Sequence, residues 1–218
     1  MKSQPGAEEI ISATRTWIER AVIGLNLCPF AKPAHLHNRI RYFVSAARSR
    51  AKLLEGLMDE LRALEAADPA QCETTLLIHP HVLSDFSDYN AFLEQADDAV
   101  SELGLEGVIQ VASFHPRYQF EDTGPDDIEN FTNRSPYAML HLLRESSVER
   151  AVTTYPDTTT IYRDNIETLR RLGHEGWRRL WVAEDPQDSS AHRWGRGYPR
   201  DSVEYPFRKD KLRKRYCG

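Results

Sequence analysis

The chain has 218 residues, 40% of them hydrophobic and 28% charged, and its formal net charge is −5 at pH 7. This length and composition are typical of one globular domain with a sizeable core, and the mildly acidic balance gives no reason to expect a nucleic-acid partner. No apolar run approaches the roughly 18 residues of a membrane span, so we expect no membrane partner either.

The cysteines and the N-terminus bear on the cellular compartment. Cys28, Cys72 and Cys217 are odd in number and far apart, which argues against a disulfide framework and for a reducing compartment. The first residues lack the basic start and apolar stretch of a secretory signal. We therefore predict a cytoplasmic protein, and the sequence leaves its oligomeric state open.

Helical and extended patterns alternate along the first half of the chain. Apolar residues at helical spacing predict an amphipathic helix over residues 7–25. The patterns that follow are, in order, a strand at 39–45, a helix at 53–64, a strand at 74–78, a helix at 89–103 and a strand at 108–114. Ser87 or Asp88 is the expected N-terminal cap of the helix at 89–103.

The spacing of these strands predicts the fold class. Their ends fall near residues 44, 79 and 115, an interval of about 35 residues that is typical of successive β-α-β crossovers. Nearly continuous apolar strands separated by helices favour a parallel sheet that is covered on both faces. We predict an α/β fold of three or more mainly parallel strands with helices on both faces and further C-terminal helices. A ferredoxin-like α+β fold is the alternative.

The second half of the chain carries weaker patterns. Residues 117–134 are polar but include aromatic side chains, which favours an ordered lid or binding loop over disorder. Ser135, followed by proline, predicts the start of a fourth helix that runs to residue 150, and a fifth helix is expected at 162–172. The periodicity is lost after residue 184, so we predict a single α/β domain at 7–184 and an irregular, basic tail at 185–218.

Histidines stand where two of the predicted strands end. His79 and His81 follow the strand at 74–78, and His115 follows the strand at 108–114. Because ligands of open parallel sheets bind outside the carboxyl ends of the strands, these side chains are the first candidates for a functional site. Neutral imidazoles suit Zn²⁺, Fe²⁺ or Mn²⁺, so one interpretation is a divalent transition-metal site held by all three histidines.

Two other interpretations of these histidines stay open. His79 and His115 could act as acid–base catalysts without a metal, since imidazole titrates close to neutral pH. Alternatively, each ring could simply end its strand, hydrogen-bonded to a carbonyl group of the following loop.

A set of polar residues near the start of the predicted fourth helix is suited to an anion. Asn133, Arg134 and Ser135 occupy that position, and Arg117 follows the second strand-end histidine. A helix N-terminus offers unpaired N–H groups and a positive dipole end, so these four residues are candidates for binding a phosphate or carboxylate. Ordinary helix capping by Ser135 is the alternative.

Cys28, just past the first helix, is a candidate nucleophile. A reactive thiolate forms where nearby cations lower the pKa of the thiol, and Lys32, His35 and His37 are close in sequence. The alternative is a small buried residue, because no second cysteine stands at Cys-x-x-Cys spacing.

Three stretches of the chain are distinctive: Asn-Leu-Cys-Pro-Phe at 26–30, Ser-Phe-His-Pro-Arg-Tyr-Gln-Phe at 113–120, and Thr-Asn-Arg-Ser-Pro-Tyr at 132–137 with Leu-His-Leu-Leu-Arg-Glu at 140–145. Together they resemble a bacterial family of uncharacterised proteins, a domain of unknown function, over residues 8–180. The resemblance implies a bacterial, cytoplasmic protein. It carries no activity, cofactor or catalytic residue.

Two functions from different classes follow from the sequence. The first is an enzyme that acts on a small anionic substrate at the strand-end edge, with His79 or His115 as acid–base groups and the arginines as the anion site. The second is a non-catalytic regulatory module that binds a ligand or metal at the same edge. Whether the protein is an enzyme is left open.

Overall fold

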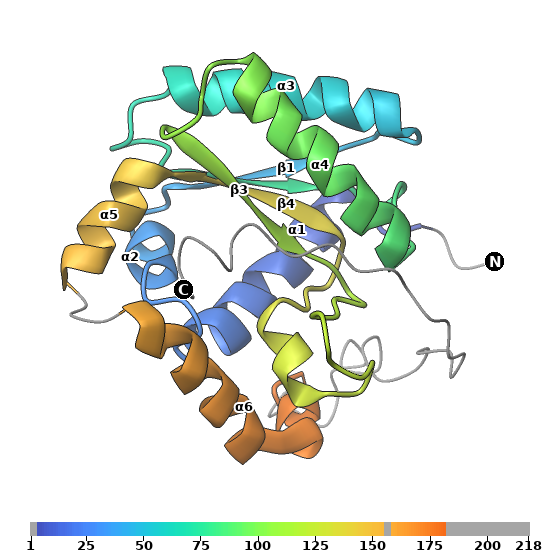
Figure 1. Ribbon diagram of the computed structural model, residues 1–218, viewed down its shortest axis with the longest axis vertical. Coiled ribbons are helices and arrows are strands. Elements are labelled where there is room, and N and C mark those ends of the chain that lie inside the picture. The colour runs from blue at the N-terminus through green and yellow to red at the C-terminus, as the bar shows by residue number, and fades with distance from the viewer. Residues whose placement is uncertain (1–3, 155–157, 182–218) are drawn as a thin grey trace.

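A computed structural model describes residues 4–154 and 158–181, which form a four-stranded sheet between two layers of helices (Figure 1). The predicted tail at 185–218 lies outside the described residues, as does the end of the predicted domain. Within the described part of the chain, no helix combines the length and the apolar character needed to cross a lipid bilayer.

The sheet is mixed. Its strands are β1 (Ile40–Val44), β2 (Thr74–Ile78), β3 (Ile109–Phe114) and β4 (Met139–Arg144), in the spatial order β1-β2-β4-β3. β1 pairs with β2 in parallel, whereas β4 is antiparallel to both β2 and β3. The prediction of a mainly parallel sheet is therefore wrong. The chain order β-α-β-α-β-β also differs from the β-α-β-β-α-β order of the ferredoxin-like alternative.

The error lies in one segment, residues 139–144, which were expected in the fourth helix. They form β4, and the helix α5 (Glu145–Thr154) begins only at the end of the strand. Met139, Leu140 and Leu142 are all fully buried, because the two faces of the central strand are both covered. A short apolar run of this kind suits a buried strand as well as a buried helix, so its periodicity could not decide between them.

Helices cover both faces of the sheet, as predicted (Figure 1). One face, which we call the α4 face, packs against α3 (Arg50–Ala66) and α4 (Phe86–Glu102). The opposite face, the α1 face, packs against α1 (Ala7–Trp17), the π-helix η1 (Ile18–Ile23) and α6 (Thr158–Arg179).

Alternation along the strands divides the core between these faces. Leu77, Leu140 and Leu142 belong to the core of the α4 face. Leu76 and Met139, their neighbours along the chain, belong to the core of the α1 face. This is the two-residue period expected of a strand buried on both sides.

The predicted helices are present with shifted ends. The first continues from α1 into η1 without interruption and ends at Ile23. α4 begins one turn earlier than expected, because Asp85 caps it by accepting hydrogen bonds from two backbone N–H groups. α6 extends beyond Gly173, which kinks the helix through its positive φ of 63°. The short helix α2 (Ala31–Leu36) was not predicted.

Candidate functional site

The structure brings two of the strand-end histidines together. β1, β2 and β3 run in the same direction, so His79 and His115 follow strands that end at the same edge, on either side of β4. Tyr89 of α4 lies close to both, with its ring centroid 5.7 Å from that of His79 and 5.0 Å from that of His115. The Tyr89 hydroxyl donates to the carbonyl of Met139 and accepts from the N–H of Phe114, which fixes the ring against β3 and β4.

Both imidazoles are enclosed, with 0% of His79 and 1% of His115 exposed. Nδ1 of His79 donates to the carbonyl of Val82 at 3.0 Å, and Nε2 of His115 donates to the carbonyl of Leu83 at 3.2 Å. Nδ1 of His115 accepts from the N–H of Arg117. These contacts match the structural interpretation, in which each ring holds the loop after its strand.

Burial also fixes the charge of the two rings. Desolvation lowers the pKa of His79 to about 4 and that of His115 to about 3, so both are neutral at pH 7. One nitrogen, Nε2 of His79, is buried without a hydrogen-bond partner among the described residues.

The histidines do not form a metal-ligand set. Across residues 4–154 and 158–181, no group of three His, Cys, Asp or Glu side chains is placed to hold a metal ion. His81 therefore does not join His79 and His115 around a common point. The lone pair of His115 is also engaged, since Nδ1 accepts from the backbone of Arg117.

All four candidate anion-binding residues already make hydrogen bonds within the protein. Arg134, only 7% exposed, donates to the carbonyls of Tyr118 and Pro125 and lies over the ring of Phe131. The side-chain amide of Asn133 donates to the carbonyl of Ser113, and the Ser135 hydroxyl donates to the backbone carbonyl of Tyr137. Arg117 donates to the carbonyl of Ser84 and pairs with Asp85 at 3.4 Å.

The helix that motivated this anion site is absent from its place. The residues after Ser135 lead into β4, so the helix N-terminus that was expected next to Asn133 and Arg134, with its unpaired N–H groups, is not formed there. The polar loop at 117–134 is a packed part of the fold, because Phe131 contacts Trp177 of α6.

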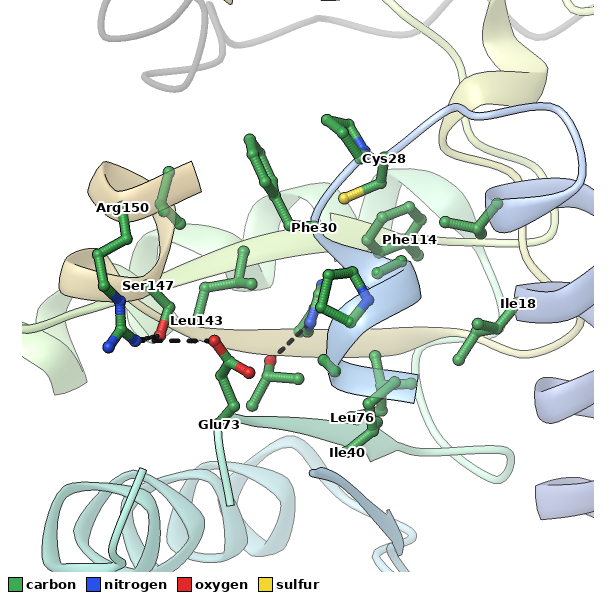
Figure 2. A pocket seen from close by; sticks show the side chains of 18 of the residues that line it. Ile18, Cys28, Phe30, Ile40, Glu73, Leu76, Phe114, Leu143, Ser147 and Arg150 are labelled. Atoms are coloured by element: carbon green, nitrogen blue, oxygen red, sulfur yellow. Dashed lines mark hydrogen bonds and ion pairs between the residues drawn. The ribbon is translucent and has the colours of Figure 1, made fainter. Parts of the chain in front are cut away.

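The described part of the chain contains a cavity of about 300 Å³ on the α1 face (Figure 2). Its floor is the sheet, with Ile40, Leu76 and Leu143 from β1, β2 and β4. Its roof includes Ile18 of η1 and Ala34 of α2, and its rim includes α5. The lining is mostly apolar, as is usual for sites that bind small molecules.

His141, in the middle of β4, is the central polar residue of this cavity. The hydroxyl of Thr74 donates its only proton to the carbonyl of Leu142, at 2.6 Å. Nε2 of His141 lies 2.7 Å from the same hydroxyl oxygen and must therefore donate to it. This contact fixes the tautomer of His141, and Nδ1 keeps a lone pair that accepts no hydrogen bond from the described residues.

The charge of His141 follows from its surroundings. Burial lowers its pKa to about 4, so the ring is neutral at pH 7. A neutral imidazole with one nitrogen held by a hydroxyl group is arranged to accept a hydrogen bond or a proton at the other.

Charged groups gather at the α5 end of the cavity. Figure 2 shows Arg150, Ser147 and Glu73 together at one end, with Ile18 at the opposite end. Arg150 donates to the Ser147 hydroxyl at 2.9 Å, and its guanidinium lies 3.7 Å from the carboxylate of Glu73. Glu73 pairs more closely with Arg39, at 3.2 Å.

Cys28 also lines the cavity, beside Phe30 (Figure 2). Burial raises the pKa of its thiol, although the N–H groups of Phe30 and Ala31 act in the opposite direction. The thiol is therefore protonated at neutral pH, which does not favour the nucleophile interpretation.

A family model for proteins of unknown function, DUF1415, matches residues 9–179. The chain belongs to the DUF1415 family. This confirms the predicted membership of a domain of unknown function over almost the same residues, whereas a bacterial origin stays a prediction. Searches of curated proteins and of solved structures found no significant match. The residues matched by the DUF1415 model include all the described residues that line the cavity.

Sequence reasoning missed the polar residues of this DUF1415 cavity. His141 was assigned to a helix, and Thr74 was treated only as the start of a strand. One signal was available: the run from Tyr137 to Leu143 is apolar except for His141, and a single histidine inside a buried run needs a hydrogen-bond partner.

Proposed function

We propose that this DUF1415 protein binds a small molecule with a largely apolar body in the cavity of the α1 face. The observation that carries the proposal is the combination of an apolar cavity with a neutral histidine whose tautomer is fixed. The volume lies at the lower end of the range of roughly 300–1,000 Å³ that is usual for ligand pockets, which favours a small ligand.

The lining residues have distinct parts in this proposal. Ile40, Leu76 and Leu143 offer the apolar surface against which the body of the ligand packs. Nδ1 of His141 accepts a hydrogen bond from a hydroxyl or similar donor of the ligand, and Thr74 holds the ring in the required orientation.

Acid–base catalysis by His141 is a second candidate function, and the Thr74 contact favours it. General bases are commonly oriented by a hydrogen bond at the nitrogen that does not react. With its pKa lowered to about 4, His141 is unprotonated at neutral pH but is a weak base, so this candidate requires that a bound substrate raises its pKa. In this form of the enzyme hypothesis, the base is His141 and not His79 or His115. Cys28 only lines the cavity.

Binding of 1-naphthol, followed by calorimetry, tests the first proposal. We expect saturable binding to the unmodified protein and loss of binding in Ala34→Leu, which extends a side chain from α2 into the cavity. Ala91→Leu is the matched control, because Ala91 is exposed on α4 on the opposite side of the sheet. Equal binding by all three proteins would contradict the proposal.

A comparison of 1-naphthol with naphthalene tests the role of His141. We expect the hydroxyl to strengthen binding by about tenfold, the usual effect of one buried hydrogen bond. His141→Leu should remove this difference and keep naphthalene binding. A hydroxyl preference that survives in His141→Leu would exclude His141 as the acceptor, and with it the catalytic candidate.

A further inference from the structure

The cavity is open over the second half of β4. Although β4 is a central strand, His141 and Leu143 on its α1 face are only half-buried, whereas Leu140 and Leu142 on its α4 face are fully buried. His141 and Leu143 both line the cavity, so the surface that they leave uncovered is the surface offered to a ligand.

Three of the rings that line the cavity contact one another. Phe114, at the end of β3, meets the ring of Trp17 edge to face, with the centroids 5.3 Å apart. The centroid of the same Phe114 ring lies 6.1 Å from that of His141. A ligand group that is hydrogen-bonded to His141 is therefore close to an aromatic surface.

Phe30 is a fourth ring of the lining, and it lacks such a contact (Figure 2). It is half-buried at the start of α2, and its ring makes no aromatic contact with any other residue that the structure describes. The ring of a ligand can therefore make with Phe30 the edge-to-face or offset contact that aromatic side chains favour.

The polar group of the cavity favours a particular kind of hydroxyl. The hydroxyl of a phenol has a pKa of about 10, several units below that of an alcohol, and is therefore the stronger hydrogen-bond donor. Because burial lowers the pKa of His141 to about 4, a phenol keeps its proton beside it, and the contact joins two neutral groups. A neutral pair suits an apolar lining, in which an ion would lose its hydration.

We propose that the ligand is a phenol, bound with its hydroxyl on Nδ1 of His141 and its aromatic ring against Phe114 and Phe30. This inference rests on the proposed function, since it names the class of molecule that the cavity takes. An aliphatic alcohol makes the hydrogen bond without the ring contacts, and an aromatic hydrocarbon makes the ring contacts without the hydrogen bond.

Calorimetry with three compounds of similar size tests this inference: 4-indanol, 1-indanol and the fully hydrogenated form of 4-indanol. The two indanols are isomers, of which 4-indanol carries the hydroxyl on its aromatic ring and 1-indanol carries it on its saturated ring. We expect 4-indanol to bind at least about tenfold more tightly than the hydrogenated form, and 1-indanol to bind with an intermediate affinity.

Two variants separate the ring contact from the hydrogen bond. Phe30→Leu should reduce the preference for 4-indanol over the hydrogenated form by about two- to tenfold, with the affinity for the hydrogenated form unchanged. Phe43→Leu is the matched control and should keep the preference, because Phe43 is a half-buried phenylalanine of β1 that packs on the α4 face. His141→Leu should bring the two indanols to equal affinity.

Each outcome is decisive. Equal affinities for 4-indanol and its hydrogenated form, or tighter binding of 1-indanol, would overturn the phenol inference and leave the apolar cavity as a binding site. A preference for 4-indanol that persists unchanged in Phe30→Leu would also overturn it. If none of the three compounds binds and 1-naphthol does not bind either, the proposed function itself fails.

Discussion

The histidines on the two faces of the sheet lie in different surroundings. On the α4 face, His79 and His115 are packed around Tyr89 and donate to carbonyls of the loop after β2. On the α1 face, His141 binds Thr74 through one nitrogen and lines a cavity. The availability of a histidine in this fold therefore depends on what covers its face of the sheet, and not on its position at the end of a strand.

One short helix, α2, explains why the α1 face keeps a cavity although longer helices cover the rest of it. α3 and α4 have 17 residues each, and their apolar side chains cover the α4 face. On the α1 face, the cover above Leu76 and Leu143 includes α2, a helix of only 6 residues next to Pro29. A helix this short presents few side chains to the sheet, and space remains beneath it.

Acidification has the largest expected effect on stability. In the unfolded chain each of the three histidines takes up a proton below about pH 6.5, whereas in the folded protein the pKa is about 4 for His79 and His141 and about 3 for His115. The stabilisation is therefore complete above pH 6.5 and is lost as the pH falls towards 4, by up to about 4 kcal/mol per pH unit for the three together. Urea unfolding between pH 7.5 and 4.5 measures this slope.

A variant of His141 shows how much of this pH dependence of the unfolding free energy comes from each face of the sheet. His141→Gln should remove about one third of it, because His79 and His115 remain. An unchanged slope would show that His141 is not held neutral by burial.

Removal of a ring should cost more on the α4 face. His115→Ala is expected to lower the free energy of unfolding by about 3 kcal/mol, because it leaves a cavity next to Tyr89 and the carbonyl of Leu83 without its donor. His141→Leu should cost less than about 1 kcal/mol, because that ring already borders open space. Equal losses, measured by urea unfolding at pH 7, would contradict the difference between the faces.

Added volume should have opposite effects on the two faces. Ala34→Leu fills part of the cavity and is expected to stabilise the protein by about 1 kcal/mol. Ala96→Leu, in the packed core of α4, should destabilise it by about 1–3 kcal/mol. Thermal unfolding of the two variants measures both signs, and a loss of stability in Ala34→Leu would show that the cavity cannot accept a larger side chain.

The smallest effect is on the reactivity of two thiols. Cys28 lines the cavity, whereas Cys72 packs against the core of the α4 face. We expect iodoacetamide to label Cys28 slowly at pH 7, because burial raises its pKa, and saturating 1-naphthol to slow this labelling further. Labelling of Cys72 should not respond to 1-naphthol. Peptide mapping distinguishes the two sites, and a response at Cys72 alone would place the ligand elsewhere.

Local sequence patterns predicted much of the scaffold correctly. The strand at 74–78 was expected at the residues where β2 is found, and the strands at 39–45 and 108–114 each contain the observed strand. These elements follow from apolar periodicity and turn residues, which act over a few neighbouring positions. The expectation that His79 and His115 would lie close together was also sound, since their strands run in the same direction.

By itself, the sequence determined the order of the helices and strands in the first half and the family to which the chain belongs. Tertiary structure alone decided that residues 139–144 pair as a strand between β2 and β3, and that His141 thereby meets Thr74, 67 positions earlier in the chain. It also decided that the strand-end imidazoles are enclosed by aromatic rings of α4. The reason is physical: periodicity shows that a segment has an apolar face, but which partner covers that face depends on packing between residues that are distant in the chain.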